Sequence, residues 1–556
     1  MGGSLPGADE IDIPVFVFIL PFMNSASRRR VTVWCYILPI VFLVHLTACG
    51  GNATLETTNN GKIYFVDMTG GIDTNSGMAM DNAWKTISKV NSSSFSPGDT
   101  ILFKRGETWR EQLVISSSGN TGNPITYGAY GTGALPEIVG SGSDYALSVD
   151  SRNNVTIQDF EFNNDGYTAI RMTSLSRTNH SNTIQRCKIV VTGSNPGAYS
   201  IQMYLTNPFY SLNILNNEIT NPSGQGLRVE AFGVSLYDMN ISYNDFHDIG
   251  LQAIRFFDME EYVSSTSSPY GISIDHNTFT DIKRSAIETT AGMRHVEGYP
   301  NYIGYNTALR IGSDAVPNVN AFQLNWIRSA IIEHNFIDTI RTSAPDGDGI
   351  ILDFSFSDHN YMCDDLIVRY NTVTGANASF GRTSGINVIA VTNSSIHHNI
   401  LYNNQIGISL TTSMPSGNVF FNNVMDDNFY GALETHANLG HGDAPASIWE
   451  NNIFSNNKVG FYVQKGSAPP TESYNLFHGN INDNNIWLIE KGNQALSGTD
   501  KTGNPSFFNR SLRDYRITSS SAARDAGIFV GVTSDILGNP VPGGIATDIG
   551  AYEINF

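Results

Sequence analysis

Cysteine is scarce in this sequence, with 4 in 556 residues. Cys35 and Cys49 lie near the N-terminus, so only Cys187 and Cys363 are left for the remainder of the chain. None of the four has the close spacing of zinc ligands, and the two later cysteines lie in distant parts of the sequence. The sequence therefore predicts neither a disulfide framework nor a cysteine metal site.

Basic residues are also few, with 32 Lys and Arg against 51 Asp and Glu and a formal net charge of −19. This balance argues against nucleic-acid binding, which needs a basic surface. It also disfavours a polyanionic substrate unless Ca²⁺ or a local basic groove intervenes. Long stretches with an apolar period of 3.6 residues are absent as well, which argues against a helical solenoid.

What the chain does contain is a short phrase that recurs along its length. The phrase has an apolar residue, a few variable residues, an Asn, one variable residue and another apolar residue. Its Asn residues are Asn217, Asn244, Asn277, Asn335, Asn371, Asn399, Asn423 and Asn452. They follow one another at intervals of 24 to 36 residues, except for a step of 58 residues from Asn277 to Asn335. A period of this size is typical of a repeat architecture, in which each unit stacks on the next.

The position of the Asn predicts the geometry of each coil. Its flanks are β-branched and aromatic and alternate with a period of two, which indicates short strands joined by turns. We expect the Asn to adopt the left-handed conformation in its turn and to hydrogen-bond its equivalent one coil away. Such stacking predicts an all-β, right-handed parallel β-helix with an internal Asn ladder. An antiparallel sandwich would have no constant Asn position, and the 58-residue step has room for a further coil.

The N-terminus has the features of a targeting signal. Arg28–Arg30 precede an apolar run from Val31 to Leu46, and a basic segment, an apolar segment and small residues make a secretory signal. The closing Leu-Thr-Ala-Cys resembles a bacterial lipobox, so Cys49 is the expected lipidation site, with a simple membrane anchor as the alternative. Gly50 in the next position favours an outer-membrane lipoprotein of the cell envelope.

Both ends of the remaining chain resemble a known family. Ile63–Asp67, Trp84 and Pro97–Gly106 follow the order of the N-terminal cap of secreted bacterial pectate-lyase-like β-helix proteins. Asp535–Pro540 and Asp548–Glu553 are similar to a frequent closing module of bacterial extracellular β-helix proteins. The resemblance implies a carbohydrate-active protein, although this fold hosts lyases, hydrolases, epimerases and adhesins.

Five segments are expected along the chain. They are a lipoprotein-type signal over 1–48, a tether over 49–62, an N-terminal cap with the first coils over 63–140, the parallel β-helix with long loops over 141–480 and a C-terminal capping module over 481–556. The repeats make most of this length one elongated unit rather than several globular domains.

Each repeat has a second strand that begins about nine to fourteen residues after its Asn. With Ile and Leu pointing into the coil, the third and fifth positions of this strand point outward. The third positions are Arg228, Arg255, Glu288, Ile351, Asn387 and Glu434, and the fifth positions are Glu230, Phe257, Thr290, Asp353, Ile389 and His436. The longest segments between strands border this face and are rich in Tyr, Trp, His and Arg, the groups that bind sugar rings and their hydroxyls. A solvated surface would be polar too.

Paired carboxylates on this face predict glycoside hydrolysis, which uses one carboxyl as acid and another as base or nucleophile. We expect Asp353 to be the base or nucleophile and Glu288 or Asp348 to be the general acid. If Glu288 and Asp353 lie on neighbouring coils, their backbones are roughly 8 Å apart, which permits a retaining or an inverting reaction. The expected substrate-binding residues are Arg228, Arg255, Arg294, His295, Asn387, His436 and Trp326.

Other functions also fit the sequence. Asp346, Asp348 and Asp358 are candidate Ca²⁺ ligands, although no full loop template is present and turn chemistry accounts equally well for Asp348. The arginines suit a Ca²⁺-assisted polysaccharide lyase acting on a uronate polymer, and a non-catalytic glycan-binding surface protein is a third possibility. The leading expectation is a monomeric, lipid-anchored hydrolase that needs no cofactor and acts on a polysaccharide or oligosaccharide.

Overall fold

The computed structural model describes most of the chain after residue 60. The described residues are 61–140, 145–257, 268–290, 292–313, 319–340, 347–354, 362–377, 383–410, 417–435, 447–464, 470–481, 485–488 and 492–554. They belong to one compact unit, Thr58–Phe556. In this part of the chain no helix has both the length and the apolar character needed to cross a membrane. Cys49, the expected lipidation site, lies outside the described residues.

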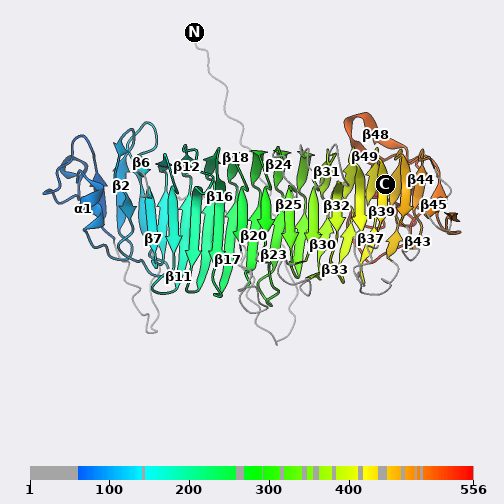
Figure 1. Cartoon of the computed structure of the whole chain (residues 1–556), viewed down its shortest axis with the longest axis horizontal. Helices are drawn as coiled ribbons and strands as arrows, with labels where there is room; N and C mark the ends of the chain where they lie inside the picture. Colours follow the sequence, from blue (N-terminus) through cyan, green and yellow to red (C-terminus); the bar gives the residue numbers. More distant parts are fainter. Residues whose placement is uncertain are drawn as a thin grey trace, which may run out of the picture. The chain divides into compact units, whose positions relative to one another are not determined.

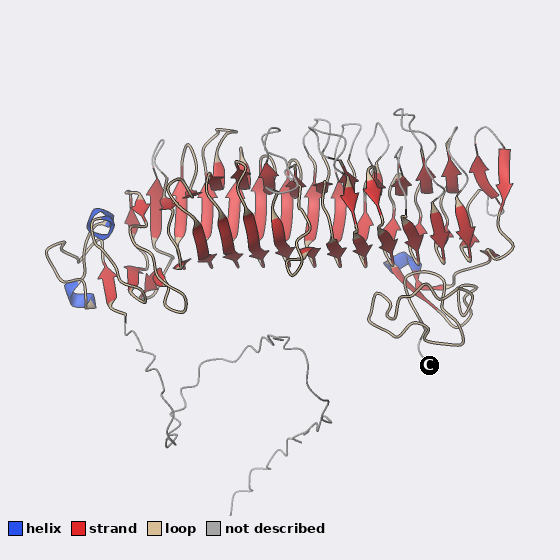
Figure 2. Ribbon diagram, turned by 90° about the horizontal axis from the view of Figure 1, so that it is seen from below, coloured by secondary structure: helices blue, strands red, loops and turns tan. Residues whose placement is uncertain are grey.

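Three sheets of 15 strands each run along this unit (Figures 1 and 2). Sheet A runs from β1 (Ile63–Val66) to β43 (Thr471–Ser473), sheet B from β3 (Thr108–Trp109) to β47 (Lys501–Thr502), and sheet C from β4 (Leu113–Val114) to β46 (Gly492–Ala495). The chain passes through A, B and C in turn, and strands of successive coils pair in parallel, except for the antiparallel last pair of sheet C, β45 (Asn485–Leu488) with β46. The expected right-handed parallel β-helix is confirmed.

One coil illustrates why the sequence folds this way. It contains β14 (Phe209–Leu215) in sheet A, β15 (Glu218–Asn221) in sheet B and β16 (Gln225–Ala231) in sheet C. Alternate side chains of each strand point inward, and those of Leu212, Ile214 and Ile219 are at most 1% exposed. Stacking of such coils buries a continuous apolar core along the axis, which no coil could bury alone.

The Asn ladder is present, and Asn306 joins it from the coil for which the 58-residue step had room. Its members are Asn217, Asn244, Asn277, Asn306, Asn335, Asn371, Asn399, Asn423, Asn452 and Asn475. In each step the side-chain oxygen of one Asn accepts from the backbone N–H of the preceding one, as between Asn335 and Asn371 at 3.1 Å. The ladder begins at Cys187, whose N–H donates to Asn217, and ends at Asp500, which accepts from Asn475.

Asn306 belongs to the coil hidden in the 58-residue step. This coil contributes β23 (Asn301–Gly304), β24 (Thr307–Ile311) and β25 (Phe322–Asn325). Because β25 pairs with β22 (Ile287–Thr289) on one side and β28 (Ile350–Asp353) on the other, Glu288 and Asp353 do not lie on neighbouring coils. That conditional pairing is therefore wrong.

We expected the ladder Asn to adopt the left-handed conformation. The residue before it does so instead. Tyr243, His276, Tyr305, His334 and Tyr370 all have φ between 54° and 60°. Their rings stack along the turn, for example Tyr305 on His334 with ring centroids 4.6 Å apart. The Asn supplies the hydrogen bonds, and the stacked rings help to offset the strain of a positive φ at bulky residues.

The N-terminal cap covers the first coil of the stack. Its short helix α1 (Ile87–Asn91) buries Ile87 and Val90, and its N-cap Thr86 accepts from Lys89 N–H. The ring of Trp84 stacks on Tyr64 of β1, with centroids 4.9 Å apart. These contacts give the open edge of sheet A an apolar cover, which a solenoid end needs.

The C-terminal segment packs against the side of the stack. Its strands β48 (Phe507–Asn509) and β49 (Asp514–Ile517) form a small antiparallel pair. Together with the rest of this segment they cover the outward face of sheet B at β35 (Ile400–Tyr402), β38 (Val424–Asp426), β41 (Ile453–Ser455) and β44 (Leu476–His478). Residues 507–551 are called the lateral module below.

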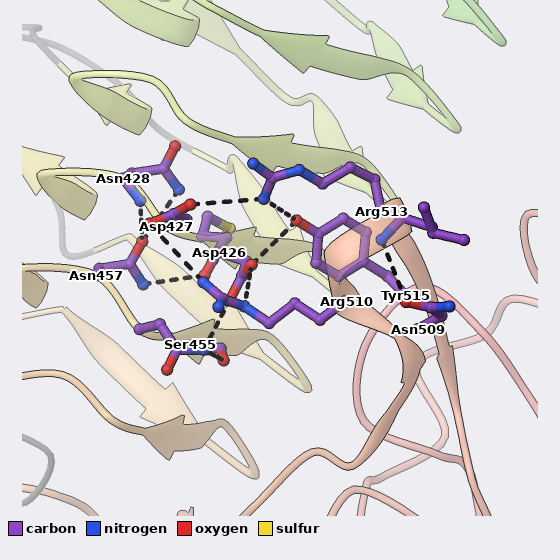
Figure 3. A network of polar contacts seen from close by, with 12 residues as sticks. Asp426, Asp427, Asn428, Ser455, Asn457, Asn509, Arg510, Arg513 and Tyr515 are labelled. Atoms are coloured by element: carbon purple, nitrogen blue, oxygen red, sulfur yellow. Dashed lines mark hydrogen bonds and ion pairs between the residues drawn. The ribbon is translucent and has the colours of Figure 1, made fainter.

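An ion pair fastens the lateral module to sheet B (Figure 3). Asp426 is fully buried and accepts from Arg510 Nε at 2.8 Å and from Tyr515 Oη at 3.0 Å. Arg513 reaches Asp427 at 3.5 Å. The carboxylates within the module, among them Asp535 and Asp548, accept backbone N–H groups at turns.

Candidate functional site

The third positions of the sheet C strands form a continuous outward column. Its order is Arg228, Arg255, Glu288, Gln323, Ile351, Asn387, Ser409 and Leu433. The strands that carry its middle part, besides β22, β25 and β28, are β19 (Ile254–Phe257) and β32 (Ser384–Val388). The predicted column is therefore largely correct, with Gln323 added from the hidden coil.

Glu434 was assigned to this column wrongly. Leu433 occupies the outward position of β39 (Tyr430–Glu434), while Glu434 is fully buried and accepts from Trp449 Nε1 at 2.8 Å. The error is a slip of one residue, because Gly431 rather than Ala432 is equivalent to Gly349. A one-residue slip moves a side chain to the opposite face.

Glu288 lies at the centre of a hydrogen-bonded network on sheet C. Its Oε1 is 2.8 Å from Arg255 Nε, and its Oε2 accepts from Gln252 Nε2 at 2.8 Å. Gln252 in turn accepts from Gln225, which accepts from Arg228. Glu288 is 5% exposed. Both of its oxygens thus have protein donors, an arrangement that suits the partner of an arginine at least as well as a proton donor to substrate.

The two arginines of the column are held in place by their neighbours. Arg228 pairs with Glu230 at 3.0 Å, and both arginines lie over the ring of Phe257, at 4.0 Å for Arg228 and 4.7 Å for Arg255. Burial lowers the pKa of Arg255, as does the charge of Arg228, while Glu288 acts in the opposite direction. The pair therefore presents a rigid, partly desolvated cationic edge.

Asp348 and Asn387 are brought together as neighbours. Asp348 is 2% exposed, and its carboxylate accepts from Ser384 N–H at 2.6 Å and from Asn387 Nδ2 at 2.8 Å. Its own N–H donates to the Asn320 side chain. This carboxylate thus links the turns of successive coils and orients the Asn387 amide on the outward column.

Asp353 lies at the end of β28, where sheet C gives way to the connection toward sheet A. Its side chain is half-buried and accepts from Phe354 N–H at 2.7 Å. Its backbone carbonyl accepts from Trp326 N–H at 2.8 Å. Its register partner on β25 is Asn325. Asp353 is therefore positioned by backbone contacts on both sides and points outward as predicted.

Arg294, His295 and Trp326 form a second neighbourhood rather than joining the outward column. They line a groove of about 550 Å³ together with Arg328, Ser329, Asp364, Asp365 and Asn393. Arg294 lies over the ring of Tyr270 at 4.1 Å, and Trp326 is almost completely buried. This groove, called the edge groove below, lies where sheet C strands lead to sheet A strands.

Several predicted site residues cannot be placed. His436, Asp346 and Asp358 lie outside the described residues. Within the described part of the chain, no group of three or more His, Cys, Asp or Glu is arranged to hold a metal ion.

The sequence reasoning missed the polar residues that support the column. Gln225 is the first residue of β16, Gln252 lies two residues before β19, and Gln323 comes from the hidden coil. Asp364 was not considered, although Arg328, Thr392 and Asn393 all donate to it. The repeated Gln before Gly226 and Ala253 was the signal that could have identified the first two.

Comparison with known proteins adds a relationship along most of the chain. No family model matches it. A lacto-N-biosidase of Bifidobacterium longum subsp. longum is 21% identical over 91% of this chain, and the chain spans 37% of that relative's length. A solved structure of a GH136 lacto-N-biosidase from Eubacterium ramulus is similar with a TM-score of 0.42 and 14% identity, over 70% of this chain and 67% of that one. A complex of XylC with xylose gives a TM-score of 0.41 and 13% identity, over 88% and 98% of the two chains.

Proposed function

We propose that this protein is an extracellular glycoside hydrolase that acts on an oligosaccharide. The observation that carries the proposal is the outward face of sheet C, where Glu288, Asp353 and the edge residue Asp348 lie among fixed arginines and amides. The sequence relationship to a lacto-N-biosidase over 91% of the chain supports hydrolysis of a glycosidic bond.

Asp353 is the proposed base or nucleophile. Its half-buried carboxylate lies on the outward face and accepts from Phe354 N–H at 2.7 Å. Glu288 and Asp348 are the proposed alternatives for the general acid, and each would have to exchange an existing protein hydrogen bond for one to the leaving group. Arg255 and Asn387 would orient the sugar through planar donors.

The stereochemistry of the reaction distinguishes the partners of Asp353. With β25 between them, the backbones of Glu288 and Asp353 are separated by two strand spacings and two residues, roughly 12 Å. That distance suits the wider carboxyl separation of inverting enzymes better than the narrow separation of retaining ones. A product of retained configuration, followed by NMR, would exclude Glu288 as the partner and require a carboxylate closer to Asp353.

The first experiment measures hydrolysis of p-nitrophenyl lacto-N-bioside and of a panel of neutral oligosaccharides by the purified mature chain. Asp353→Asn should reduce kcat by about 10²-fold or more with an unchanged Tm, because removal of a base or nucleophile acts on the transition state. Glu218→Gln, an acid-to-amide change on sheet B, is the matched control. Glu288→Gln and Asp348→Asn, compared at equal Tm, identify the acid.

Two outcomes contradict the proposal. An unsaturated uronate that absorbs in the ultraviolet would indicate β-elimination, the Ca²⁺-assisted lyase reaction. Binding of glycans without release of any product after long incubation would indicate a glycan-binding surface protein. Full activity of Asp353→Asn would leave hydrolysis in place but move its centre elsewhere.

The proposed location is the cell envelope, with the mature chain attached to the outer membrane by a lipid on Cys49. The basic and apolar segments before Cys49 support export. Metabolic labelling with a radioactive fatty acid should mark the wild-type chain, and Cys49→Ser should lose both the label and the membrane association. Membrane association retained by Cys49→Ser would favour a simple apolar anchor.

A further inference from the structure

The edge groove combines a large volume with a mixed-charge lining. Its volume of about 550 Å³ falls within the range of small-molecule sites. Arg294, His295 and Arg328 contribute hydrogen-bond donors, and Asp364, Asp365 and Asn393 contribute acceptors. The function proposed above uses the face of sheet C and leaves this groove without a role.

One side of the groove is fixed by its own contacts. Asp364 accepts from Arg328 at 3.2 Å, from Thr392 at 2.8 Å and from Asn393 at 2.9 Å. Burial alone would raise the pKa of Asp364, but these hydrogen bonds and the Arg328 guanidinium lower it, so the group stays ionised at neutral pH. A rigid, ionised carboxylate held beside a guanidinium forms a wall that does not rearrange when a ligand enters.

The other groups remain available to a ligand. His295 is exposed. Asp365 accepts from Ser329 Oγ at 2.7 Å through one oxygen, which leaves capacity on the other. The groove therefore offers donors and acceptors within the same small volume.

The groove meets the proposed reaction centre at its sheet C end. Trp326 lines the groove, and its backbone N–H donates to the backbone carbonyl of Asp353 at 2.8 Å. Asn325, the residue before Trp326, is the register partner of Asp353. The groove is therefore adjacent to the strand end that carries Asp353.

We propose that the edge groove is a subsite for a neutral sugar unit of the same oligosaccharide that is cleaved at Asp353. This inference rests on the proposed function. A sugar hydroxyl both donates and accepts, so alternating carboxylates and cationic groups satisfy it. Two arginines and two carboxylates line the groove, and this balance of formal charge favours a neutral unit.

The experiment separates binding from cleavage. The Asp353→Asn chain is titrated calorimetrically with the neutral tetrasaccharide lacto-N-tetraose and with a monosialylated form. His295→Ala and Asp365→Asn are then added to that background, because the first is exposed and the second keeps the residue size and its left-handed backbone. Each should weaken binding of the neutral sugar about fivefold, the effect of one lost hydrogen bond.

A second groove supplies the matched control. It has a volume of about 330 Å³, lies where sheet B strands lead to sheet C strands, and is lined by Asp281, Arg310 and Ser313 among others. Ser313→Ala should leave the affinity unchanged. All variants are compared at equal Tm.

The outcomes distinguish this inference from the proposed function. If the wild-type chain hydrolyses the neutral sugar but the edge-groove variants bind and cleave it normally, the subsite is wrong and the hydrolase stands. If the wild type cleaves nothing while the variants lose binding, the groove stands as a glycan site and the hydrolase fails. Equal or tighter binding of the sialylated form would overturn the preference for a neutral unit.

Discussion

At the scale of single residues, most side chains of the candidate site are fixed by hydrogen bonds and ion pairs with one another. The ion pair of Arg255 with Glu288 and its extension through Gln252 make a polar network in a partly desolvated place. Such networks are costly to leave half satisfied. The column is thus as much a stability element as a candidate binding surface, and the two roles need separate measurements.

Arg255→Met should destabilise the protein by about 3 kcal/mol, because it leaves the buried Glu288 carboxylate without its cation. Urea unfolding followed by circular dichroism gives this difference. Adding Glu288→Gln to Arg255→Met should recover most of the loss, since the remaining amide no longer carries a buried charge. A double variant as unstable as the single one would mean that packing of the arginine stem, not the charge, is what matters.

The residues also show where sequence reasoning stops. Alternation along a strand placed Arg228, Arg255, Glu288, Asn387 and Asp353 on the outward face correctly, because inward and outward positions differ sharply in polarity. It failed at Glu434, since Ala432 and Gly431 both fit the start of the strand and the choice decides the face. It could not place Arg294 against Tyr270, because contacts of a long connection are set by packing rather than by a period.

At the scale of elements, the Asn ladder is the feature that the sequence predicts best. Each ladder Asn lies in a short sequence motif that repeats from coil to coil, so the period of the Asn residues suffices to identify the ladder. A second ladder, Asn404, Asn428, Asn457 and Asn480, stabilises the turn between sheets B and C in the later coils. It was missed because it occupies only that part of the chain.

Asn335→Ala should cost about 3 kcal/mol of stability. The side chain donates to Ile303 O at 3.0 Å and to Asn371 Oδ1 at 2.9 Å, and it accepts from the buried N–H of Asn306 at 3.1 Å. Leaving buried polar partners unsatisfied is more expensive than the net value of the bonds themselves. The denaturant midpoint should fall, whereas Asn163→Ala on the outer face of sheet B should change it little. Equal effects at both positions would argue against a special role for the ladder.

The end of the ladder introduces a dependence on pH. Glu472 points inward from β43, opposite Asp500, and is 9% exposed. Burial and the adjacent Asp500 raise the pKa of Glu472 to about 8 from its ordinary 4.5. Burial also raises the pKa of Glu553, two residues after the lateral module, to about 7. In both cases the folded state retains a proton that the unfolded chain releases earlier.

Stability should therefore be fully present below about pH 4.5 with respect to Glu472 and decline as the pH rises toward about 8. Glu472→Gln keeps the neutral form permanently, so the Tm of this variant should fall less over the same range. Calorimetric scans at several pH values test this. Parallel curves for the two proteins would show that Glu472 does not set the slope.

At the scale of the whole molecule, the lateral module explains a change in character along sheet B. One outward column of that sheet carries Glu161, Lys188, Glu218 and Asp245 in its early coils and Ile400, Val424, Ile453 and Leu476 in its later coils. The apolar members are those that the module covers. The sequence motifs near the C-terminus predicted a closing module. Its lateral position could not be predicted in the same way, because it depends on contacts between segments about 80 to 130 residues apart.

Arg510→Ala should loosen the lateral module. Asp426 would keep Tyr515 and Asn456 as donors but lose its only arginine among the contacts described here. Limited proteolysis should cut within 507–551 several-fold faster than in the wild type. Arg516→Ala is the matched control, because Arg516 pairs with Asp514 inside the module and does not reach sheet B. Similar proteolysis of both variants would show that the ion pair to Asp426 does not secure the module.

The apolar column of sheet B also has a consequence for the order in which the chain matures. Coils can form one after another as the polypeptide emerges, since each needs only its predecessor. In the coils from Ile400 to Leu476, however, the outward apolar column is exposed until residues 507–551 have been synthesised and have packed against it. Aggregation with other chains is therefore expected to be most probable late in synthesis, while this apolar column is still exposed.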